Sequence, residues 1–399
     1  MDRGRRHRVV VTGLGVIASC GIGKDAFFAG LSGPAAEGPQ RVDEFDPSVW
    51  FDAKEARQTD RFAQLSVAAA QLALDDAGEL LADPTRCGVI FGTGTGGLAT
   101  IQEQIILLIA KGPQRVSPRL VPMMMGNAGA AAISIRFGWR GPCETVVTAC
   151  ASATHAISNA FRLVGDGRCD AVITGGAEAA ITASGGLDAI GLAAFANMTA
   201  LSTSGHSRPF DRRRDGFVIA EGSGALVLEE LGQARSRNAH IYAEILGAAS
   251  TADAYHITAP APGGQGAVAC MELALEDAGI SPAEVACING HGTSTPLNDL
   301  AEAEAISKVF GRPGPPVTSI KGVTGHSLGA AGALEAVASI LSIEHGLIPP
   351  TAGLEEEDPE IHLDIVTGAA RPFTPGPVLS NSFGFGGHNG CLVFGPPSP

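Results

Sequence analysis

Short apolar segments alternate with longer helical segments along most of this chain. Residues 9–19 begin with a run of valines and are interrupted by threonine and glycine, which favours a buried first strand over a cleaved targeting segment. Further short strands, each followed by a turn rich in glycine or alanine, are expected at residues 88–91, 145–148, 286–289 and 316–320. Strands that alternate with helices in this way predict an α/β fold whose sheets are largely parallel and buried.

One stretch of the first half recurs in the second half. AQLALDDAG at 70–78 returns as MELALEDAG at 271–279, and each copy predicts a helix that ends at a glycine. A short strand follows each copy and leads into loops of one design, FGTGTG at 91–96 and HGTSTP at 291–296. The repeat therefore indicates a duplicated structure.

The simplest arrangement is two similar halves, residues 1–240 and 241–399, which pack as one body without a linker. The helices that follow Cys150 and His326 contain little besides alanine, glycine, serine and leucine. Helices that are apolar on nearly every face belong in the interior of a protein, so these two should lie between sheets.

Composition narrows the class of protein. Of the 399 residues, 45% are hydrophobic and 17% are charged, which excludes a disordered chain and allows a large core. The net charge of −14, without any long basic run, makes nucleic acid a poor partner. Eight cysteines are too few for a disulfide scaffold, and no apolar run reaches the roughly 18 residues of a membrane span. We therefore expect a cytoplasmic protein that makes no membrane contact.

Cys150 is the first candidate for chemistry. It lies in TACASATH at 148–155, where a predicted strand turns into a helix. The positive end of a helix dipole favours the thiolate, which is the nucleophilic form of a cysteine. A free cysteine is more often buried and inert, and we expect the other seven cysteines to be of that kind. For Cys150, the turn and the histidines described next favour a nucleophile.

Two histidines occupy glycine-rich loops at the ends of strands. His291 lies in NGHGTSTP at 289–296, and His326 lies in KGVTGHSLGAAG at 321–332. The repeat relates both loops to glycine loops of the first half, so a two-fold relation would place both histidines near Cys150. Ligands of α/β proteins bind at the carboxyl ends of strands, and we therefore expect a catalytic site there.

A third glycine-rich segment, NSFGFGGHN at 381–389, precedes the last predicted strand. Flexible glycines around two phenylalanines indicate a loop that comes close to a substrate. A phosphate-binding loop is disfavoured, because neither the lysine with serine or threonine nor the helix of such a loop follows. No group of cysteines and histidines has the sequence spacing of metal ligands, so we expect neither a metal nor another cofactor.

These motifs together resemble those of a known enzyme family. The motifs of β-ketoacyl-acyl-carrier-protein synthases of types I and II are similar to the segments at 148–153, 290–296, 321–332 and 381–387. The resemblance implies the thiolase fold, a duplicated α/β/α/β/α body of five layers, and a condensing acyltransferase. One cysteine with two histidines is the set of types I and II, whereas thiolases use a second cysteine. Non-catalytic chain-length factors lack the cysteine that is present here.

The resemblance implies a role for each motif. Cys150 would hold the growing acyl chain as a thioester, and the backbone N–H groups of Cys150 and Phe385 would form the oxyanion hole. His291 and His326 would bind the thioester carbonyl of a malonyl group and stabilise the enolate that remains when CO2 leaves. Phe385 would also be the gate residue, whose ring moves when the acyl chain enters.

Further residues follow from the same resemblance. Lys321 would order the site, paired with Glu335 in the following helix, and would not act as a nucleophile. Thr293 and Thr295 would contact the phosphopantetheine arm that carries each substrate. Thr95 stands where type II enzymes often have a bulkier residue that limits pocket depth, so the resemblance implies no preferred chain length.

The implied partner is an acyl-carrier protein, and the chain is expected to form a homodimer or a heterodimer with a chain-length-factor homologue. Fatty-acid elongation is slightly favoured, and the catalytic subunit of a type II polyketide or polyene synthase remains the alternative. Because a carrier is acidic and this chain has a net charge of −14, docking requires a local positive patch. The candidate docking residues are Arg57, Arg61, Arg115 and Arg119.

Overall fold

The structure is a computed structural model that describes residues 6–181 and 190–397. Eleven strands form one mixed sheet, and two others form a separate pair. The strands are β1 (Val9–Ala18), β2 (Gly21–Ile22), β3 (Cys87–Gly92), β4 (Cys143–Val146), β5 (Ala171–Glu178), β6 (Gly222–Glu230), β7 (Ala243–Ala252), β8 (Cys287–Asn289), β9 (Val317–Thr318), β10 (Leu347–Ile348), β11 (Arg371–Pro372), β12 (Val378–Gly384) and β13 (His388–Gly395). The α-helices are α1 (Lys24–Gly30), α2 (Ala53–Ala56), α3 (Arg61–Ala77), α4 (Leu98–Lys111), α5 (Leu120–Met124), α6 (Ala128–Phe137), α7 (Ser152–Gly165), α8 (Ile190–Asn197), α9 (Leu231–Ser236), α10 (Gln265–Ala278), α11 (Pro296–Phe310), α12 (Lys321–Thr324) and α13 (Ala331–His345).

The large sheet contains two copies of one arrangement. Its strand order is β4-β3-β5-β6-β1 in the first half and, read from the other end, β9-β8-β12-β13-β7 in the second. The halves meet where residues 9–11 of β1 pair with β7. The two copies of the repeated sequence lie in α3 and α10, at the same place relative to these strands. The predicted duplication is therefore confirmed.

The strands run in both directions, which corrects the expectation of a largely parallel sheet. Parallel pairs join β3 to β4 and β5, and join β8 to β9 and β12. The remaining pairs within each half are antiparallel, including β12 with β13. Only residues 385–387, here called the gate loop, separate β12 from β13, and so short a connection can join only antiparallel strands.

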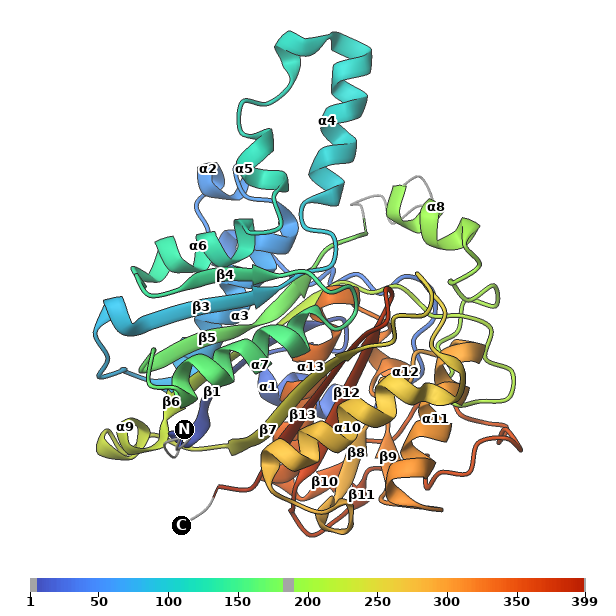
Figure 1. Cartoon of the computed structure of the whole chain (residues 1–399). Coiled ribbons are helices and arrows are strands. Elements are labelled where there is room, and N and C mark those ends of the chain that lie inside the picture. Colours follow the sequence, from blue (N-terminus) through green and yellow to red (C-terminus); the bar gives the residue numbers. More distant parts are fainter. Residues whose placement is uncertain (1–5, 182–189, 398–399) are drawn as a thin grey trace.

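Helices α7 and α13 form the middle layer (Figure 1). α7 packs on β3 and β5 of the first half and also contacts β7 and β13 of the second, while α13 packs on β6 and β12. Both helices are largely buried, as expected from their apolar composition. α3 covers the outer face of β1 and β6, and α10 covers β7 and β13. The layers therefore follow the order α/β/α/β/α, and the thiolase-like fold is confirmed.

One part of the chain stands away from this body (Figure 1). It consists of α4, the short 3-10 helix η3 (Pro113–Arg115) and α5, and it is called the projection here. Several large apolar residues of α4 are exposed on it, namely Ile105, Ile106, Leu108 and Ile109. Exposed apolar residues that cluster in this way mark a surface for another molecule.

The chain's first apolar segment is a strand, as predicted, because every residue of β1 is buried in the sheet. None of the helices in the described part of the chain combines the length and the apolar character that a membrane span requires. The segment that joins α9 to β7 contains the predicted boundary between residues 240 and 241.

Candidate active site

Cys150 lies in a tight turn between β4 and α7. Ala149 has φ 51°, a left-handed conformation that costs a residue with a Cβ about 1–3 kcal/mol. Ser152 stabilises this turn, because its Oγ accepts from the N–H of Thr148 at 2.9 Å and donates to the carbonyl of Ala149 at 2.6 Å. The turn presents Cys150 to a cavity while only 8% of the residue is exposed.

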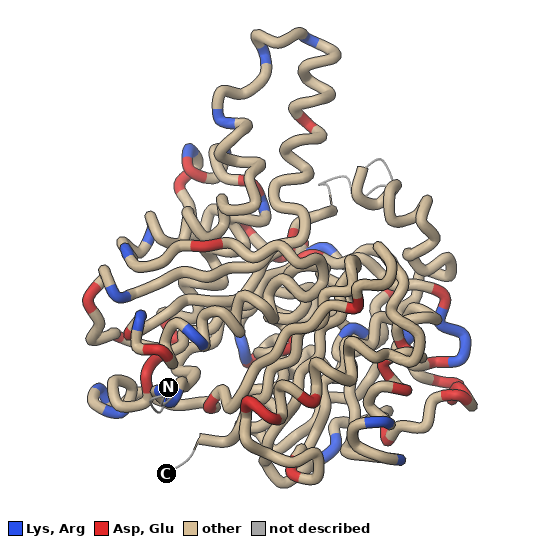
Figure 2. Tube along the Cα trace, in the orientation of Figure 1, with Lys and Arg blue, Asp and Glu red and all other residues tan. Residues whose placement is uncertain are grey.

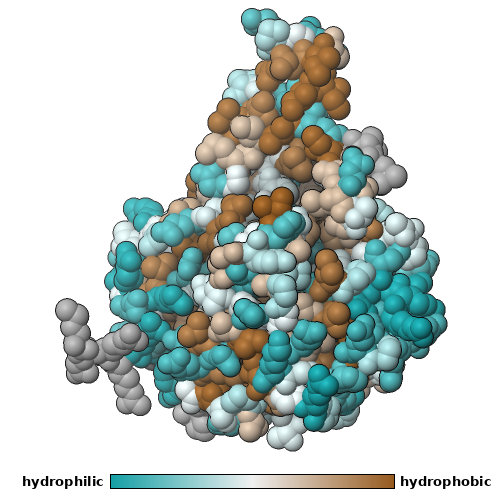
Figure 3. Space-filling model, turned by 45° about the vertical axis from the view of Figure 1, so that its right-hand side comes forward, coloured by the Kyte–Doolittle hydropathy of each residue, from teal (hydrophilic) through white to brown (hydrophobic). Residues whose placement is uncertain are grey.

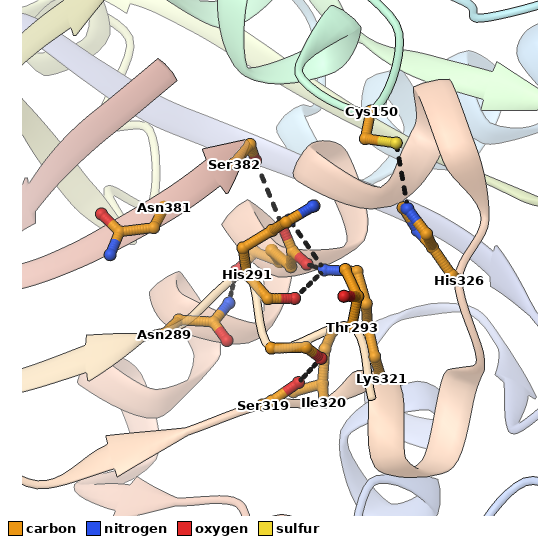
Figure 4. A network of polar contacts seen from close by, with 12 residues as sticks. Cys150, Asn289, His291, Thr293, Ser319, Ile320, Lys321, His326, Asn381 and Ser382 are labelled. Carbon is orange, nitrogen blue, oxygen red and sulfur yellow. Dashed lines mark hydrogen bonds and ion pairs between the residues drawn. The ribbon is translucent and has the colours of Figure 1, made fainter. Parts of the chain in front are cut away.

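Two histidines of the second half face this cysteine (Figure 4). Nε2 of His326 lies 3.0 Å from the Sγ of Cys150. The rings of His291 and His326 meet edge to face, with their centroids 5.4 Å apart. His291 follows β8, and His326 lies between α12 and the 3-10 helix η6 (Leu328–Ala330). The structure thus brings together three residues that are distant in sequence, as the repeat predicted.

The surroundings of Cys150 favour the thiol form of this cysteine. Burial raises the pKa of Cys150 to about 12, although the charge of Lys321 and a hydrogen bond from the Phe385 backbone both act to lower it. Desolvation therefore opposes the thiolate that the helix dipole was expected to favour. Nucleophilic attack then needs a group that takes the thiol proton, and His326 lies within reach.

Both histidines are neutral. Burial holds the pKa of His291 and of His326 well below the usual value, and the charge of Lys321 adds to this effect. Nδ1 of His291 lies 3.2 Å from the Lys321 Nζ, and because an ammonium only donates, the ring proton of His291 is on Nε2. Among the described residues, none forms a hydrogen bond with Nδ1 of His326. Because no partner at Nδ1 fixes the tautomer of His326, its Nε2 can accept a proton in one step and donate a hydrogen bond in another.

Lys321 lies at the base of the site (Figure 4). Its Nζ forms an ion pair with Glu335 and donates to the carbonyl of His291 at 2.6 Å. The side chains of Lys321 and Glu335 are only 2% and 1% exposed. Burial raises the pKa of Glu335, against the effect of the lysine charge. Lys321 thus pairs with the residue expected from the sequence, and its bonds hold the loop of His291.

Two acidic residues of α11 also hold this loop, and the sequence analysis missed both. Glu302 accepts from the N–H of His291 and from that of the next residue, each at 2.7 Å. Asp299 accepts from the N–H of Thr293 at 2.9 Å. Burial raises the pKa of both carboxyl groups, that of Glu302 to about 7. Their spacing was the available signal, because residues three apart on a helix share one face.

A cavity of about 460 Å³ leads to Cys150. Its lining is mostly apolar, and it includes Thr95, Thr293, Thr295 and Phe385, the residues expected to contact the acyl chain or its carrier arm. The hydroxyls of Thr293 and Thr295 lie 2.8 Å apart. A largely apolar cavity with a few polar groups near a nucleophile is suited to an acyl chain on a polar arm.

The four arginines expected to bind a carrier differ in their surroundings. Arg57 is exposed beside α2, and Arg115 and Arg119 are exposed on the projection, where Figure 2 shows basic residues near the tip. Arg61 instead binds both carboxylate oxygens of the buried Glu221, the shortest bond being 2.6 Å, and its side chain is 19% exposed. Because this guanidinium is already engaged, the expectation that Arg61 docks a carrier is corrected.

Cys150, His291 and His326 place their Sγ and ring nitrogens within 4.8 Å of one another. Sequence spacing did not reveal this cluster, because its members come from separate loops. Such donors suit a soft metal ion, but the Lys321 ammonium lies 3.2 Å from Nδ1 of His291 and repels a cation there. That the site works without a metal stays a prediction.

The seven other cysteines differ in exposure. Five are buried, as expected, Cys20 is half-buried, and Cys143 is exposed. Cys143 lies on β4, which ends the strand order of the sheet, so one side of this strand has no described neighbour. The expectation of a buried side chain was wrong here because the sequence does not show that β4 is an edge strand.

Two family profiles match the chain. Residues 31–234 match the family described as beta-ketoacyl synthase, N-terminal domain, and residues 242–355 match its C-terminal domain. The chain therefore belongs to the β-ketoacyl synthase family, as its motifs indicated.

Individual proteins of this family are similar over their full length. The chain is 45% identical to 3-oxoacyl-[acyl-carrier-protein] synthase 2 of Synechocystis sp., over 98% of both proteins. The solved structure of the ishigamide ketosynthase/chain length factor is 34% identical with a TM-score of 0.91, covering 98% of this chain and 100% of that chain. A type II polyketide ketosynthase bound to the hexaketide, solved with its acyl-carrier protein, is 31% identical with a TM-score of 0.88 at the same coverage.

Proposed function

We propose that this chain is a β-ketoacyl-acyl-carrier-protein synthase, an acyltransferase that lengthens a fatty acyl chain by decarboxylative condensation with a malonyl carrier. The observation that carries the proposal is one buried cysteine beside two neutral histidines at an apolar cavity. The name of the Synechocystis relative, identical at 45% of positions, supports the fatty-acid pathway. The cytoplasmic location remains a prediction from the sequence.

In the first half-reaction, the Cys150 sulfur attacks the thioester carbonyl of an acyl carrier. Nε2 of His326, at 3.0 Å, takes the thiol proton as the new S–C bond forms. The backbone N–H groups of Cys150 and Phe385 hold the oxyanion of the tetrahedral intermediate. When the intermediate collapses, the carrier thiolate leaves and receives the proton from His326. An acyl thioester on Cys150 remains.

In the second half-reaction, His291 and His326 donate N–H bonds to the thioester carbonyl of a malonyl carrier. The bond to the carboxylate breaks, CO2 leaves, and the electron pair forms an enolate whose oxygen the two imidazoles stabilise. The enolate carbon attacks the acyl carbon, and the Cys150 sulfur leaves as a thiolate that takes a proton from water. Lys321 keeps His291 oriented through its Nδ1 and carbonyl.

The cavity would receive both parts of a substrate. The hydroxyls of Thr293 and Thr295 would bond the amides of a phosphopantetheine arm. No separate cofactor would be needed, because the arm belongs to the carrier. Thr95 would border the acyl chain. Phe385 would move aside as the chain enters.

An acyl-carrier protein is the proposed partner. The 31% identical ketosynthase was solved in complex with its own acyl-carrier protein, which supports this proposal. Arg57, Arg115 and Arg119 are the exposed candidates to attract its acidic surface. Attraction of this kind acts mainly on the rate of encounter and weakens with salt.

A dimer is the proposed assembly. β4 has one edge without a neighbour in the described chain, and the exposed apolar residues of α4 form a brown area on the projection in Figure 3. An open strand edge and an exposed apolar surface each favour association. Light scattering of the purified chain tests for the homodimer, and a monomer that still condenses long chains would contradict the proposal.

The alternative is the catalytic subunit of a type II polyketide or polyene synthase. It is favoured by the similarity to the ishigamide ketosynthase/chain length factor, at 34% identity and a TM-score of 0.91. Such a subunit would form a heterodimer, so a chain-length-factor homologue that co-purifies with the tagged chain would favour this pathway over fatty-acid elongation.

The proposed chemistry is tested by incubating the protein with an acyl carrier and measuring its intact mass. We expect one acyl group per chain, located on the peptide that contains Cys150, and no acyl group on Cys150→Ala. Acylation at another residue, or equal acylation of Cys150→Ala, would refute the assignment of the nucleophile.

A further inference from the structure

Two neighbouring residues of α7 reach across to the two strands that flank the gate loop. Oγ1 of Thr154 lies 2.7 Å from the Oγ of Ser382 on β12. Nε2 of His155 lies 3.0 Å from the carbonyl oxygen of Asn389 on β13. Because β12 enters the gate loop and β13 leaves it, these bonds attach both ends of the loop to the helix that begins beside Cys150.

The chemistry of these contacts assigns a direction to each bond of His155. The carbonyl of Asn389 can only accept, so Nε2 of His155 carries a proton and donates it. Burial lowers the pKa of His155, so the ring is neutral and its Nδ1 bears a lone pair. Oγ1 of Thr148, at 2.8 Å, therefore donates to Nδ1. The imidazole therefore connects the turn that contains Cys150 to β13: it accepts one hydrogen bond from Thr148 and donates one to Asn389.

The link fixes two backbone groups that come from different halves of the chain. Thr148 precedes Cys150 by two residues, and Asn389 follows Phe385 by four. Between them the turn touches the last residue of β12, because a Cβ added to Gly384 would lie 2.9 Å from the Thr148 carbonyl oxygen and 3.0 Å from the Cys150 nitrogen. The N–H of Phe385 already donates to Cys150 across this contact.

We propose that His155 is a positioning residue that sets the distance between the N–H groups of Cys150 and Phe385, and so builds the oxyanion hole for acyl transfer. Thr148 and Asn389 are the groups through which it acts. The inference rests on the proposed function, since an oxyanion hole is needed only if Cys150 is acylated. A small displacement of one donor costs acyl transfer one to two orders of magnitude, because oriented groups lose most of their effect within about 1 Å.

Two reactions of the Cys150 sulfur distinguish a displaced oxyanion hole from a general disturbance of the site. Acylation by a small acyl-pantetheine thioester passes through an oxyanion, whereas alkylation by iodoacetamide does not. Both rates are measured by intact mass in a Cys143→Ser background, because Cys143 is exposed and would also be alkylated. The variants are His155→Ala, His155→Gln and Thr148→Val. Ser342→Ala is the matched control, since it removes a buried hydroxyl of α13 that donates to the Ala338 carbonyl of its own helix.

For His155→Ala we expect acylation to slow by about 10- to 100-fold while alkylation changes less than about threefold. His155→Gln should recover most of the acylation rate, because its amide N–H can still donate to the Asn389 carbonyl. Thr148→Val, which loses a hydroxyl but keeps the shape, should slow acylation severalfold and decides the question if His155→Ala does not fold. The Ser342→Ala control should leave both rates unchanged.

The proposal is overturned if acylation and alkylation fall together in the variants, or if His155→Gln is as slow as His155→Ala. An acylation rate that is the same in all the variants as in the parent protein also overturns it, and leaves the proposed function standing. If the parent protein is alkylated at Cys150 but never acylated there by a thioester, the proposed function itself fails.

Discussion

Glu335→Gln is the perturbation whose effect is most directly calculable from the structure. The ion pair of Lys321 and Glu335 is almost completely buried, with 2% and 1% of the two side chains exposed. Removing the carboxylate leaves a buried ammonium whose remaining partners belong to His291. Breaking such a pair at one partner costs about 3–5 kcal/mol.

This loss of stability corresponds to a lower melting temperature. With an unfolding entropy of about 2.1 cal/mol/K per residue, a chain of 399 residues melts about 4–6 °C lower for that loss. The assay is thermal unfolding followed by circular dichroism at fixed protein concentration. Glu272→Gln, at an exposed position of α10, is the matched control, and its melting temperature should stay within about 1 °C.

A second variant distinguishes the buried charge from lost packing. Lys321→Met with Glu335→Gln removes both charges, so its melting temperature should return most of the way to that of the parent protein. A parent melting temperature for Glu335→Gln, or a double variant no more stable than the single one, would show that the buried ion pair does not have this effect on stability.

Three further predictions concern the site and its partner. His326→Ala should slow both half-reactions, because His326 is the histidine that contacts the Cys150 sulfur. His291→Ala should slow malonyl decarboxylation by about 100-fold and acyl transfer much less. Equal losses in both variants and both half-reactions would contradict this. Because burial raises the pKa of Cys150 to about 12, the thiolate fraction and the rate of iodoacetamide alkylation should still increase between pH 8 and 10; a plateau below pH 8 would show a lowered pKa instead. Arg115→Glu should raise the KM for the malonyl carrier severalfold at low salt and leave turnover of a small pantetheine thioester intact, and an unchanged KM would remove Arg115 from the docking surface. Arg61→Glu should instead lower the stability of the protein through the loss of the Glu221 ion pair.

Much of the site could be predicted from the sequence, because its residues belong to short sequence motifs. The repeat indicated two equivalent halves, and the turn at Cys150 and the loops of His291 and His326 occupy related strand ends within them. Lys321 and Glu335 are only 14 residues apart, in the short helix α12 and in the next α-helix, α13. Such motifs can be recognised in a single sequence because each consists of a few neighbouring residues.

The remainder depended on partners that no local pattern identifies. Arg61 is a charged residue at the start of a helix, a position that is usually exposed, and its contact with Glu221 arises only in the folded chain. The thiolate of Cys150 was expected from a helix dipole, but desolvation, which depends on the whole surrounding core, raises the pKa. The antiparallel pairs of the sheet and the exposure of Cys143 also follow from strand order, which the alternation of apolar segments leaves open.

The proposed condensation can be followed in a single turnover of the acyl-loaded protein with a malonyl carrier, with the product carrier and the released CO2 measured together. We expect a β-ketoacyl carrier two carbons longer than the group first bound to Cys150, with one CO2 released for each chain formed. Cys150→Gln should release CO2 without forming this product, because both histidines remain. A condensation product formed by Cys150→Ala at the parent rate, or a parent protein that forms none from an acylated Cys150, would contradict the account.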